Sequence, residues 1–289
     1  MRIRATVAGV SGAIVLSALA VPAAQADDGR SWTLEPGFKA VLPTVGDTSK
    51  QASDETATSD DPKIISSVVN AGKPIVIGTK VKKTVSFSAT ATAGAFFGGV
   101  RDVATFIWVG GSIDDEDTFG FRPDAKSITC KAVDAVTTTC NGTITLDPAQ
   151  MINSHATSWH VGAYAMTGHT DEFVEFSASR VRVQSFSQLT VNASPEPVKK
   201  GKIITITGKL TRANWDTGTY KGYVNQSVQL QFKKKGAKSY TTVRTVKTGS
   251  NGILKTTVKA TVDGAWRYSF AGKSNTAAVS SAGDYVDVK

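Results

Sequence analysis

Apolar and polar residues alternate with a period of two along most of the chain after residue 63. In residues 84–91 (TVSFSATA), Val85, Phe87 and Ala89 alternate with Thr and Ser. This period is typical of a strand that buries one face. Residues 103–109 (VATFIWV) form instead a short continuous apolar run, which suits a central strand. Turn signals recur about every ten residues, and this spacing favours β-sandwiches over a helical fold.

The alternating pattern first covers residues 64–189, for which we expect one β-sandwich. The expected strands are residues 84–91, 103–109, 127–130, 140–146, 159–166 and 173–183, and only residues 148–154 are suited to a helical turn. Cys130 and Cys140 are the only cysteines. In an oxidising compartment such a pair forms a disulfide. Closing a loop of about eleven residues stabilises the fold by roughly 2.5–3 kcal/mol.

A second set of strands follows the proline-rich sequence Ser194-Pro195-Glu196-Pro197, which we take as the domain boundary because proline restricts the chain and removes ladder donors. The expected strands are residues 203–208, 227–233, 241–248, 254–260, 265–270 and 285–289. Residues 190–289 therefore predict a second sandwich. The predicted fold class is all-β, with two tandem β-sandwich domains behind a signal peptide and a disordered linker.

The start of the chain predicts export. Arg2 and Arg4 precede an apolar run, and a small-x-small site ends at Ala26, so residues 1–26 are typical of a secretory signal peptide. No later stretch has the roughly 18 apolar residues that a membrane-spanning helix needs. Residues 27–63 predict a disordered linker, because residues 46–61 lack large apolar side chains. The apolar residues at its start, Trp32, Leu34, Phe38 and Val41, either dock on the folded part or remain loose.

Charge divides the chain at the same place as the pattern. Residues 189–289 hold 17 Lys and Arg against 5 Asp and Glu, whereas residues 27–188 hold 14 against 19. A positive surface attracts polyanions over long range, although salt screens this attraction over about 8–10 Å. Outside a cell the available polyanions are anionic cell-wall polymers, acidic polysaccharides and stray nucleic acid. We therefore expect an anionic wall polymer or polysaccharide as partner and no specific nucleic acid.

The second domain also resembles a known family. The sequences Val198-Lys199-Lys200-Gly201-Lys202, Thr207-Gly208-Lys209-Leu210 and Val228-Gln229-Leu230-Gln231-Phe232, followed by Ser250-Asn251-Gly252 and residues 264–272, resemble the bacterial Ig-like modules of secreted actinobacterial proteins. Residues 73–161 are more loosely similar to the domain that precedes such a module. The resemblance implies that the fold is two tandem Ig-like β-sandwich domains and that the location is extracellular, and some such proteins carry a calcium-binding label. It implies no activity.

An aromatic loop in the second domain has two interpretations. Trp215, Tyr220 and Tyr223 lie among Asn, Asp and Gly residues, and aromatic rings with such polar groups suit a sugar-binding surface. Large aromatic residues more often pack over the end of a sandwich. The lysine cluster Lys233, Lys234 and Lys235 is a second candidate for ligand binding, although basic clusters are usually only solvated.

We expect no cofactor unless it is calcium, for which the acidic sequence Asp114, Asp115, Glu116 and Asp117 is the candidate site. Calcium takes six to eight oxygen ligands, and carboxylates clustered on a loop can supply several. The spacing differs from that of an EF-hand. The alternative interpretation is a solvated acidic turn.

No pattern points to catalysis. His155, His160 and His169 lie near Asp171 and Glu172, but their spacing matches no zinc motif. A glycosidase needs two facing carboxylates, for which Asp171 and Glu175 are the available pair. No catalytic residue is assigned, and we expect a protein that is not an enzyme.

The leading hypothesis is a secreted, non-enzymatic binding or structural protein that associates with the cell envelope or matrix through its basic second domain. One alternative is a calcium-binding extracellular module. Another is a lectin-like carbohydrate-binding protein or an accessory to a secreted hydrolase.

Overall fold

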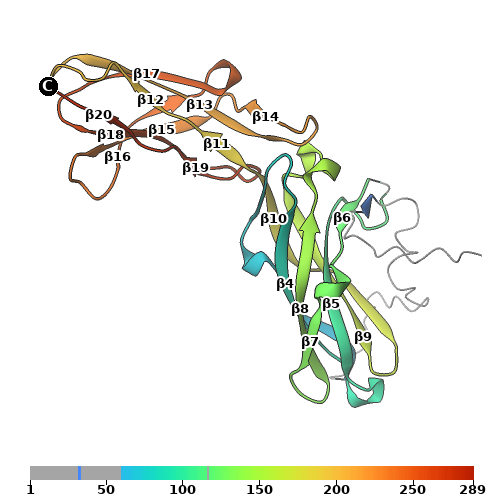
Figure 1. Cartoon of the computed structure of the whole chain (residues 1–289). Coiled ribbons are helices and arrows are strands. Elements are labelled where there is room, and N and C mark those ends of the chain that lie inside the picture. Colours follow the sequence, from blue (N-terminus) through green and yellow to red (C-terminus); the bar gives the residue numbers. More distant parts are fainter. Residues whose placement is uncertain (1–31, 34–59, 116) are drawn as a thin grey trace, which may run out of the picture.

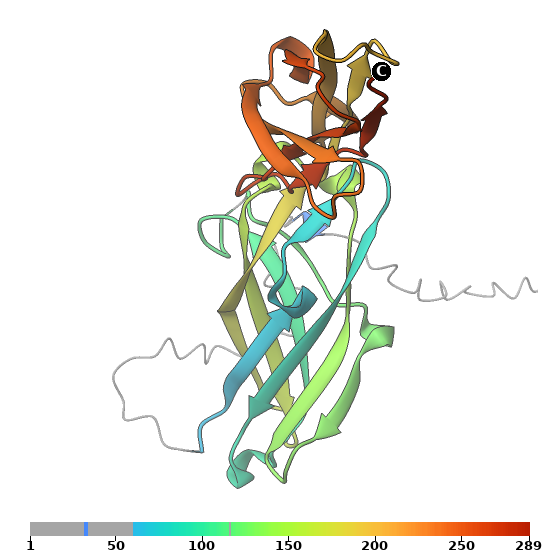
Figure 2. The same ribbon diagram turned by 90° about the vertical axis from the view of Figure 1, so that its left-hand side faces the viewer.

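The computed structural model describes residues 32–33, 60–115 and 117–289. The predicted signal peptide and most of the predicted linker lie outside the described residues. The described part consists of strands joined by loops and short 3₁₀ turns, which confirms the predicted all-β fold class. None of its helical turns is long and apolar enough to cross a bilayer. Figure 1 shows two sandwiches joined end to end at an angle, and Figure 2 shows the same pair from the side.

The first sandwich consists of two sheets. One sheet has the order β2 (Lys63–Val69), β4 (Lys83–Thr92), β8 (Thr137–Leu146), β7 (Thr129–Ala132). The other has the order β1 (Trp32–Thr33), β6 (Phe119–Phe121), β5 (Val100–Val109), β9 (Ser158–Thr167), β10 (Glu172–Ser185), β3 (Ile75–Ile77). All but β3 pairs antiparallel in these sheets; β3 runs parallel to β10.

The core of this sandwich comes from the alternation that the sequence shows. In β4, Val85, Phe87 and Ala89 are buried while the residues between them are more exposed. In β9, Trp159 and Val161 are fully buried in the same way. Burial of apolar surface is the main favourable contribution to folding, at about 25 cal/mol per Å². The two short 3₁₀ turns Pro148–Gln150 and Asn153–His155 lie where a helical turn was predicted.

The predicted disulfide is present. Cys130 of β7 and Cys140 of β8 are directly opposite each other in the antiparallel pairing, and their sulfur atoms are bonded. β7 is an edge strand whose four residues are all exposed, so little apolar burial holds it. The disulfide therefore fastens to the sheet a strand that packing alone secures weakly.

Two described parts of the predicted linker, residues 27–63, are strands in the structure. Trp32 and Thr33 form β1 and pair with Gly120 and Phe119 of β6, although they lie inside the predicted linker. At the other end, β2 already begins at Lys63. The pairing of β1 depends on a strand more than 80 residues away in the sequence, which a local pattern cannot show.

The second sandwich is built around β13 (Ile203–Asn214). The sheet that contains β13 has the order β11 (Ser187–Leu189), β13, β12 (Asn192–Ser194), and β14 (Thr219–Gly222) and β17 (Ile253–Lys259) also pair with β13. The opposite sheet has the order β16 (Thr241–Lys247), β15 (Ser227–Lys234), β18 (Gly264–Phe270), β19 (Val279–Ser280), with β20 (Asp284–Val286) paired to β18.

A buried tyrosine connects the two sheets of the second sandwich. Tyr268 of β18 is fully buried, and its hydroxyl donates a hydrogen bond to the carbonyl of Ile206 in β13 at 3.1 Å. Around it pack Ile204, Leu210 and Leu230, which are also fully buried. Burial raises the pKa of Tyr268 to about 12. The hydroxyl thus remains a neutral donor, which satisfies a polar group that would be costly to bury alone.

The second sandwich begins earlier than the sequence predicted. β11 and β12 both pair with β13, so Ser187–Leu189 belongs to the second sandwich and not to the first. The sequence Ser194-Pro195-Glu196-Pro197 begins at the last residue of β12 and lies inside the domain. Proline breaks a strand in the same way at a domain boundary and within a domain, and so it could not identify the junction.

We predict that Cys130→Ala with Cys140→Ala lowers the free energy of unfolding by about 2.5–3 kcal/mol, because the unfolded chain regains the entropy of the open loop. Chemical denaturation of the wild type and the double variant measures the difference. Reductant should lower the melting temperature of the wild type and leave that of the double variant unchanged. Equal stability of the two proteins would contradict the prediction.

Candidate functional site

Trp215, one of the predicted sugar-binding aromatics, is buried between the two sandwiches. It lies in the loop between β13 and β14 and is only 5% exposed. Its side chain packs into the core of the first sandwich, and its indole Nε1–H donates to the carbonyl of Gly78 at 2.8 Å. Ala213 belongs to the same core. A residue of the second domain thus completes the hydrophobic core of the first.

The other two aromatics of the loop do not form a platform with Trp215. Tyr220 packs against the first core and meets the ring of Phe186 edge to face, with centroids 6.3 Å apart. Tyr223 belongs to the second core, where it contacts Phe270 and lies under the guanidinium of Arg212 at 4.4 Å. In the structure the three aromatic side chains of this loop pack in the cores of the two sandwiches and do not form an exposed sugar-binding surface.

Polar groups fasten the same junction. The side-chain carbonyl of Asn153 accepts a hydrogen bond from the backbone N–H of Trp215 at 2.9 Å. The backbone N–H of Asn153 donates to a carboxylate oxygen of Asp216, also at 2.9 Å, and its side-chain amide donates to the other oxygen. A carboxylate and an amide that face each other across the interface fix its register as well as its position.

The backbone crosses the junction without a flexible linker. β10 ends at Ser185 and β11 begins at Ser187. The N–H of Phe186, between them, donates to Ile77 of the first sandwich, and its carbonyl accepts from Ala213 of the second, both at 2.8 Å. Ser185 also exchanges two hydrogen bonds of 3.0 Å with the loop before β19. No sequence pattern identifies this junction, because its partners are far apart in the chain.

His155 lies beside this junction and is held neutral. Its ring stacks on Phe119 with centroids 4.4 Å apart and meets Trp159 edge to face. Burial lowers the pKa of His155 to about 4, although the negative charge of Asp216 opposes this effect. Desolvation favours the uncharged imidazole.

The three histidines do not gather as a zinc site would require. His160 stacks on Trp108 at 4.0 Å between centroids, and its Nδ1 is 2.8 Å from the hydroxyl of Ser177. The Nδ1 of His169 is 3.0 Å from the carbonyl of Phe96, in a different loop. Each ring thus has its own local partner.

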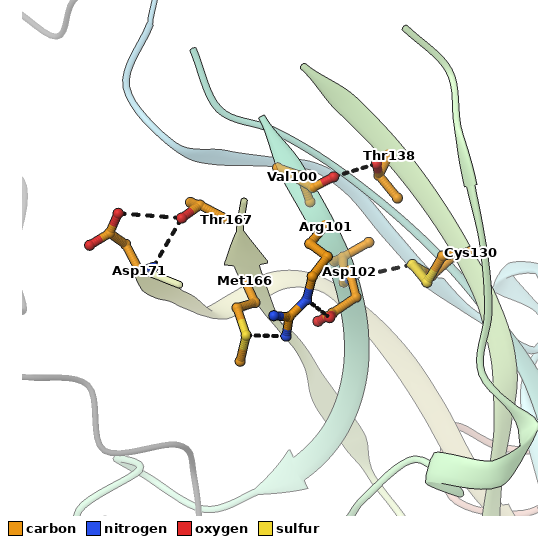
Figure 3. A network of polar contacts seen from close by, with 10 residues as sticks. Val100, Arg101, Asp102, Cys130, Thr138, Met166, Thr167 and Asp171 are labelled. Carbon is orange, nitrogen blue, oxygen red and sulfur yellow. Dashed lines mark hydrogen bonds and ion pairs between the residues drawn. A yellow bond between two sulfur atoms is a disulfide. The ribbon is translucent and has the colours of Figure 1, made fainter. Parts of the chain in front are cut away.

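The carboxylates proposed as a facing pair also have local partners. Thr167 and Asp171 close the turn between β9 and β10. The N–H of Thr167 donates to the carbonyl of Asp171, and the N–H of Asp171 donates to the hydroxyl of Thr167. The Thr167 hydroxyl also donates to the Asp171 carboxylate at 3.3 Å (Figure 3). Glu175 accepts a hydrogen bond from the N–H of Ser177 at 3.0 Å. Figure 3 also shows Arg101 paired with the neighbouring Asp102.

The acidic loop forms a tight turn. A carboxylate oxygen of Asp115 accepts the N–H of Ser112 at 2.6 Å, and its carbonyl accepts the N–H of Thr118 at 3.2 Å. Glu116 lies outside the described residues. Among the residues described, no three His, Cys, Asp or Glu side chains are placed to hold a metal ion together. The predicted calcium site of Asp114, Asp115, Glu116 and Asp117 therefore stays a prediction.

The basic residues of the second domain occupy both outer faces of the sandwich. Lys209, Lys255 and Lys259 lie on the outer face of β13 and β17. On the outer face of the opposite sheet, the guanidinium of Arg267 lies 3.9 Å from the ring centroid of Tyr240 and its Nε donates to Gln231.

The predicted cluster Lys233, Lys234 and Lys235 is divided among different contacts. The ammonium of Lys233 is 5.1 Å from the ring centroid of Tyr240. Lys235 pairs with Asp263 at 3.3 Å, and this contact raises the pKa of Lys235. Lys234 is exposed at the end of β15. The three side chains do not converge on one ligand position.

Comparison with known proteins finds no family for the chain and only distant structural similarity. No family model and no curated protein matches it. Similar solved structures include dimeric latent PorU from Porphyromonas gingivalis (14% identity, TM-score 0.25). The match covers 78% of this chain and 20% of PorU. They also include mouse nectin-like molecule 4 (12%, TM-score 0.23; 78% of this chain, 63% of that one). A third is a C-terminal fragment of the major pilin of Streptococcus agalactiae (11%, TM-score 0.25; 73% and 86%).

Both described domains are Ig-like β-sandwiches, a fold that serves as a binding or structural module in many unrelated proteins. The disulfide is consistent with an extracellular location. Secretion and actinobacterial origin stay predictions.

We predict that Trp215→Ala lowers the free energy of unfolding by about 3–5 kcal/mol, because it leaves a cavity in the core of the first sandwich and removes the bond to Gly78. Trp215→Phe should cost less, since it keeps most of the buried ring. Phe96→Ala is the control: Phe96 is 82% exposed, so its loss should change stability by no more than about 0.5 kcal/mol. Denaturation curves measure the stability of all three variants. If Trp215→Ala is as stable as the wild type, Trp215 does not contribute to the core of the first sandwich.

The lowered pKa of His155 leads us to predict that the folded protein is less stable in acid. Its pKa is about 4 in the folded protein and about 6.5 in an unfolded chain, so the unfolded state takes up the proton first as the pH falls. The free energy of unfolding should therefore fall between about pH 6.5 and pH 4. His155→Phe should lose less stability than the wild type between about pH 7 and pH 5, as measured by urea denaturation at each pH. An identical loss in both proteins would disprove the assignment to His155.

Proposed function

We propose that the protein is a secreted, non-enzymatic binding and structural protein that associates with the cell envelope through its basic second domain. The observation that carries this proposal is the charge of that domain: residues 189–289 hold 17 Lys and Arg against 5 Asp and Glu, with cations exposed on both outer faces. Such a surface attracts polyanions and raises their local concentration. Anionic cell-wall polymer or polysaccharide is the partner that this chemistry fits.

The junction supports the structural part of the proposal. Trp215, Asn153 and Phe186 connect the sandwiches through a buried ring, side-chain hydrogen bonds and main-chain hydrogen bonds. A module that is joined in this way holds the first domain at a set orientation to whatever the second domain binds. Interfaces between domains that are small and polar usually permit motion, and the buried indole distinguishes this one from them.

No observation favours the alternatives. A carbohydrate platform would need exposed aromatic rings, whereas Trp215 is buried and Tyr220 and Tyr223 pack in different cores. For the calcium hypothesis, Asp115 is engaged in the turn of its own loop. For the enzyme hypothesis, Asp171 and Glu175 have local partners.

Binding of the full-length secreted protein to purified Gram-positive cell walls tests the proposal. The logarithm of the affinity should fall linearly with the logarithm of the salt concentration, because each neutralised anion releases a counterion. Walls stripped of their anionic polymers should retain little protein. Affinity that is independent of salt, or equal binding to stripped walls, would rule out the electrostatic attachment.

A further inference from the structure

The outer face of the β13 sheet carries lysines and hydroxyls in a flat array. We call it the lysine face; its outward residues are Asn192, Ser194, Ile203, Thr205, Thr207, Lys209, Ile253, Lys255, Thr257 and Lys259. Their neighbours in each strand point into the core, as Ile204, Ile206, Leu254 and Val258 do. The array contains no acidic residue. Neither its three lysines nor its hydroxyls lie near the junction with the first sandwich, which is at the Ala213 end of β13.

The pairing of β13 with β17 sets the spacing of the lysines. Lys209 is opposite Ile253, Lys255 is opposite Thr207, and Lys259 is opposite Ile203. Residues two apart in a strand are about 6.6–6.8 Å apart along its axis. Lys209 and Lys255 are therefore diagonal neighbours, and Lys259 lies about 13 Å further along. The Cα atoms of the three lysines therefore span about 20 Å along the strand direction, on two neighbouring strands.

The lysines of this face have no competing partner within the described residues. Lys209, Lys255 and Lys259 are exposed, and none forms an ion pair there. On the opposite sheet the arrangement differs, because Arg267 is bound to Gln231 and Tyr240, and Lys235 to Asp263. An ion pair or cation–π contact must be given up before an external anion can bind. The opposite sheet also has three exposed lysines without an ion pair among the described residues, Lys234, Lys238 and Lys247. Two of them lie at the hairpin between β15 and β16, so they do not continue a row along neighbouring strands as the lysines of the lysine face do.

We propose that the lysine face binds a linear phosphodiester polymer, which lies along β13 and β17 with its phosphates on Lys209, Lys255 and Lys259. Thr205 and Thr257 donate hydrogen bonds to phosphate oxygens between the ammonium groups, whereas the hydroxyl of Thr207 already donates to the carbonyl of Asn192. This inference rests on the proposed attachment to anionic wall polymer and assigns the face and the chemical class. Lysine is a point charge that binds phosphate without the planar geometry that arginine offers to carboxylates.

The composition of the face selects the phosphodiester polymer over other polyanions. The face has no aromatic ring on which a pyranose of an acidic polysaccharide could stack, and no aromatic platform for the bases of a nucleic acid. A flexible chain with regularly spaced phosphates needs neither. It needs only cations in a row and donors beside them.

The experiment compares two triple variants with the same change in charge. Lys209→Gln, Lys255→Gln and Lys259→Gln together remove the lysine face. Lys234→Gln, Lys238→Gln and Lys247→Gln remove three exposed lysines from β15, β16 and their hairpin on the opposite sheet. All six positions are exposed, so both variants should fold, and thermal melts check this. The probe is purified polyglycerol phosphate, with polygalacturonate and duplex DNA as further arms.

We expect the lysine-face variant to lose about tenfold or more in affinity for polyglycerol phosphate and about two units of salt slope, since each phosphate contact contributes about 0.7–0.9 units. The control variant should lose about threefold or less. Equal losses in both variants would mean diffuse attraction, which overturns the face assignment and leaves the proposed function standing. The same holds if the wild type binds walls but prefers polygalacturonate or DNA. Failure of the wild type to bind walls in a salt-dependent way would remove the proposed function itself.

Discussion

The arrangement of this protein depends on one side chain that belongs to the second domain and is buried in the first. Trp215 fills the end of the first core, and its indole N–H satisfies the carbonyl of Gly78. A large aromatic ring contributes more to such an interface than any single surface contact, because it removes a large apolar area from water. The hydrogen bonds of Asn153 and Phe186 then set the register. The two sandwiches consequently share a core at their junction.

Because of this junction, the difference in net charge between the two domains affects how they are oriented at a binding surface. The basic second domain is held in a set relation to the first, so an attachment made by one positions the other (Figure 1). Long-range attraction does not require that the cations gather on a single face, and here they occupy both faces of the second sandwich. The two faces differ in how their cations are placed. Among the described residues, Arg267 and Lys235 have partners on the opposite sheet, whereas Lys209, Lys255 and Lys259 form no ion pair and lie in a row along β13 and β17.

Several polar residues that are close in sequence have separate local partners in the structure, for a common physical reason. Successive residues of a strand point to opposite faces, and the polar groups next to a hairpin turn form hydrogen bonds within that turn. His155 is held neutral against Phe119, His160 stacks on Trp108, and Asp171 closes the turn with Thr167. Each group forms a contact that stabilises the fold locally. Such contacts explain perturbed or partnered side chains without a catalytic role.

The sequence by itself determined the features that depend on local chemistry. The alternation in residues 84–91 predicted β4, the spacing of Cys130 and Cys140 predicted their disulfide, and the turn signals predicted two all-β domains. Only the tertiary structure decided that Trp215 is buried in the other domain, that the second sandwich begins at Ser187, and that Lys209 lies beside Lys255. These results depend on which distant strands pair and in what register. Side-chain periodicity specifies which residues share a face of one strand, but the neighbours of that face come from pairing over long sequence separations.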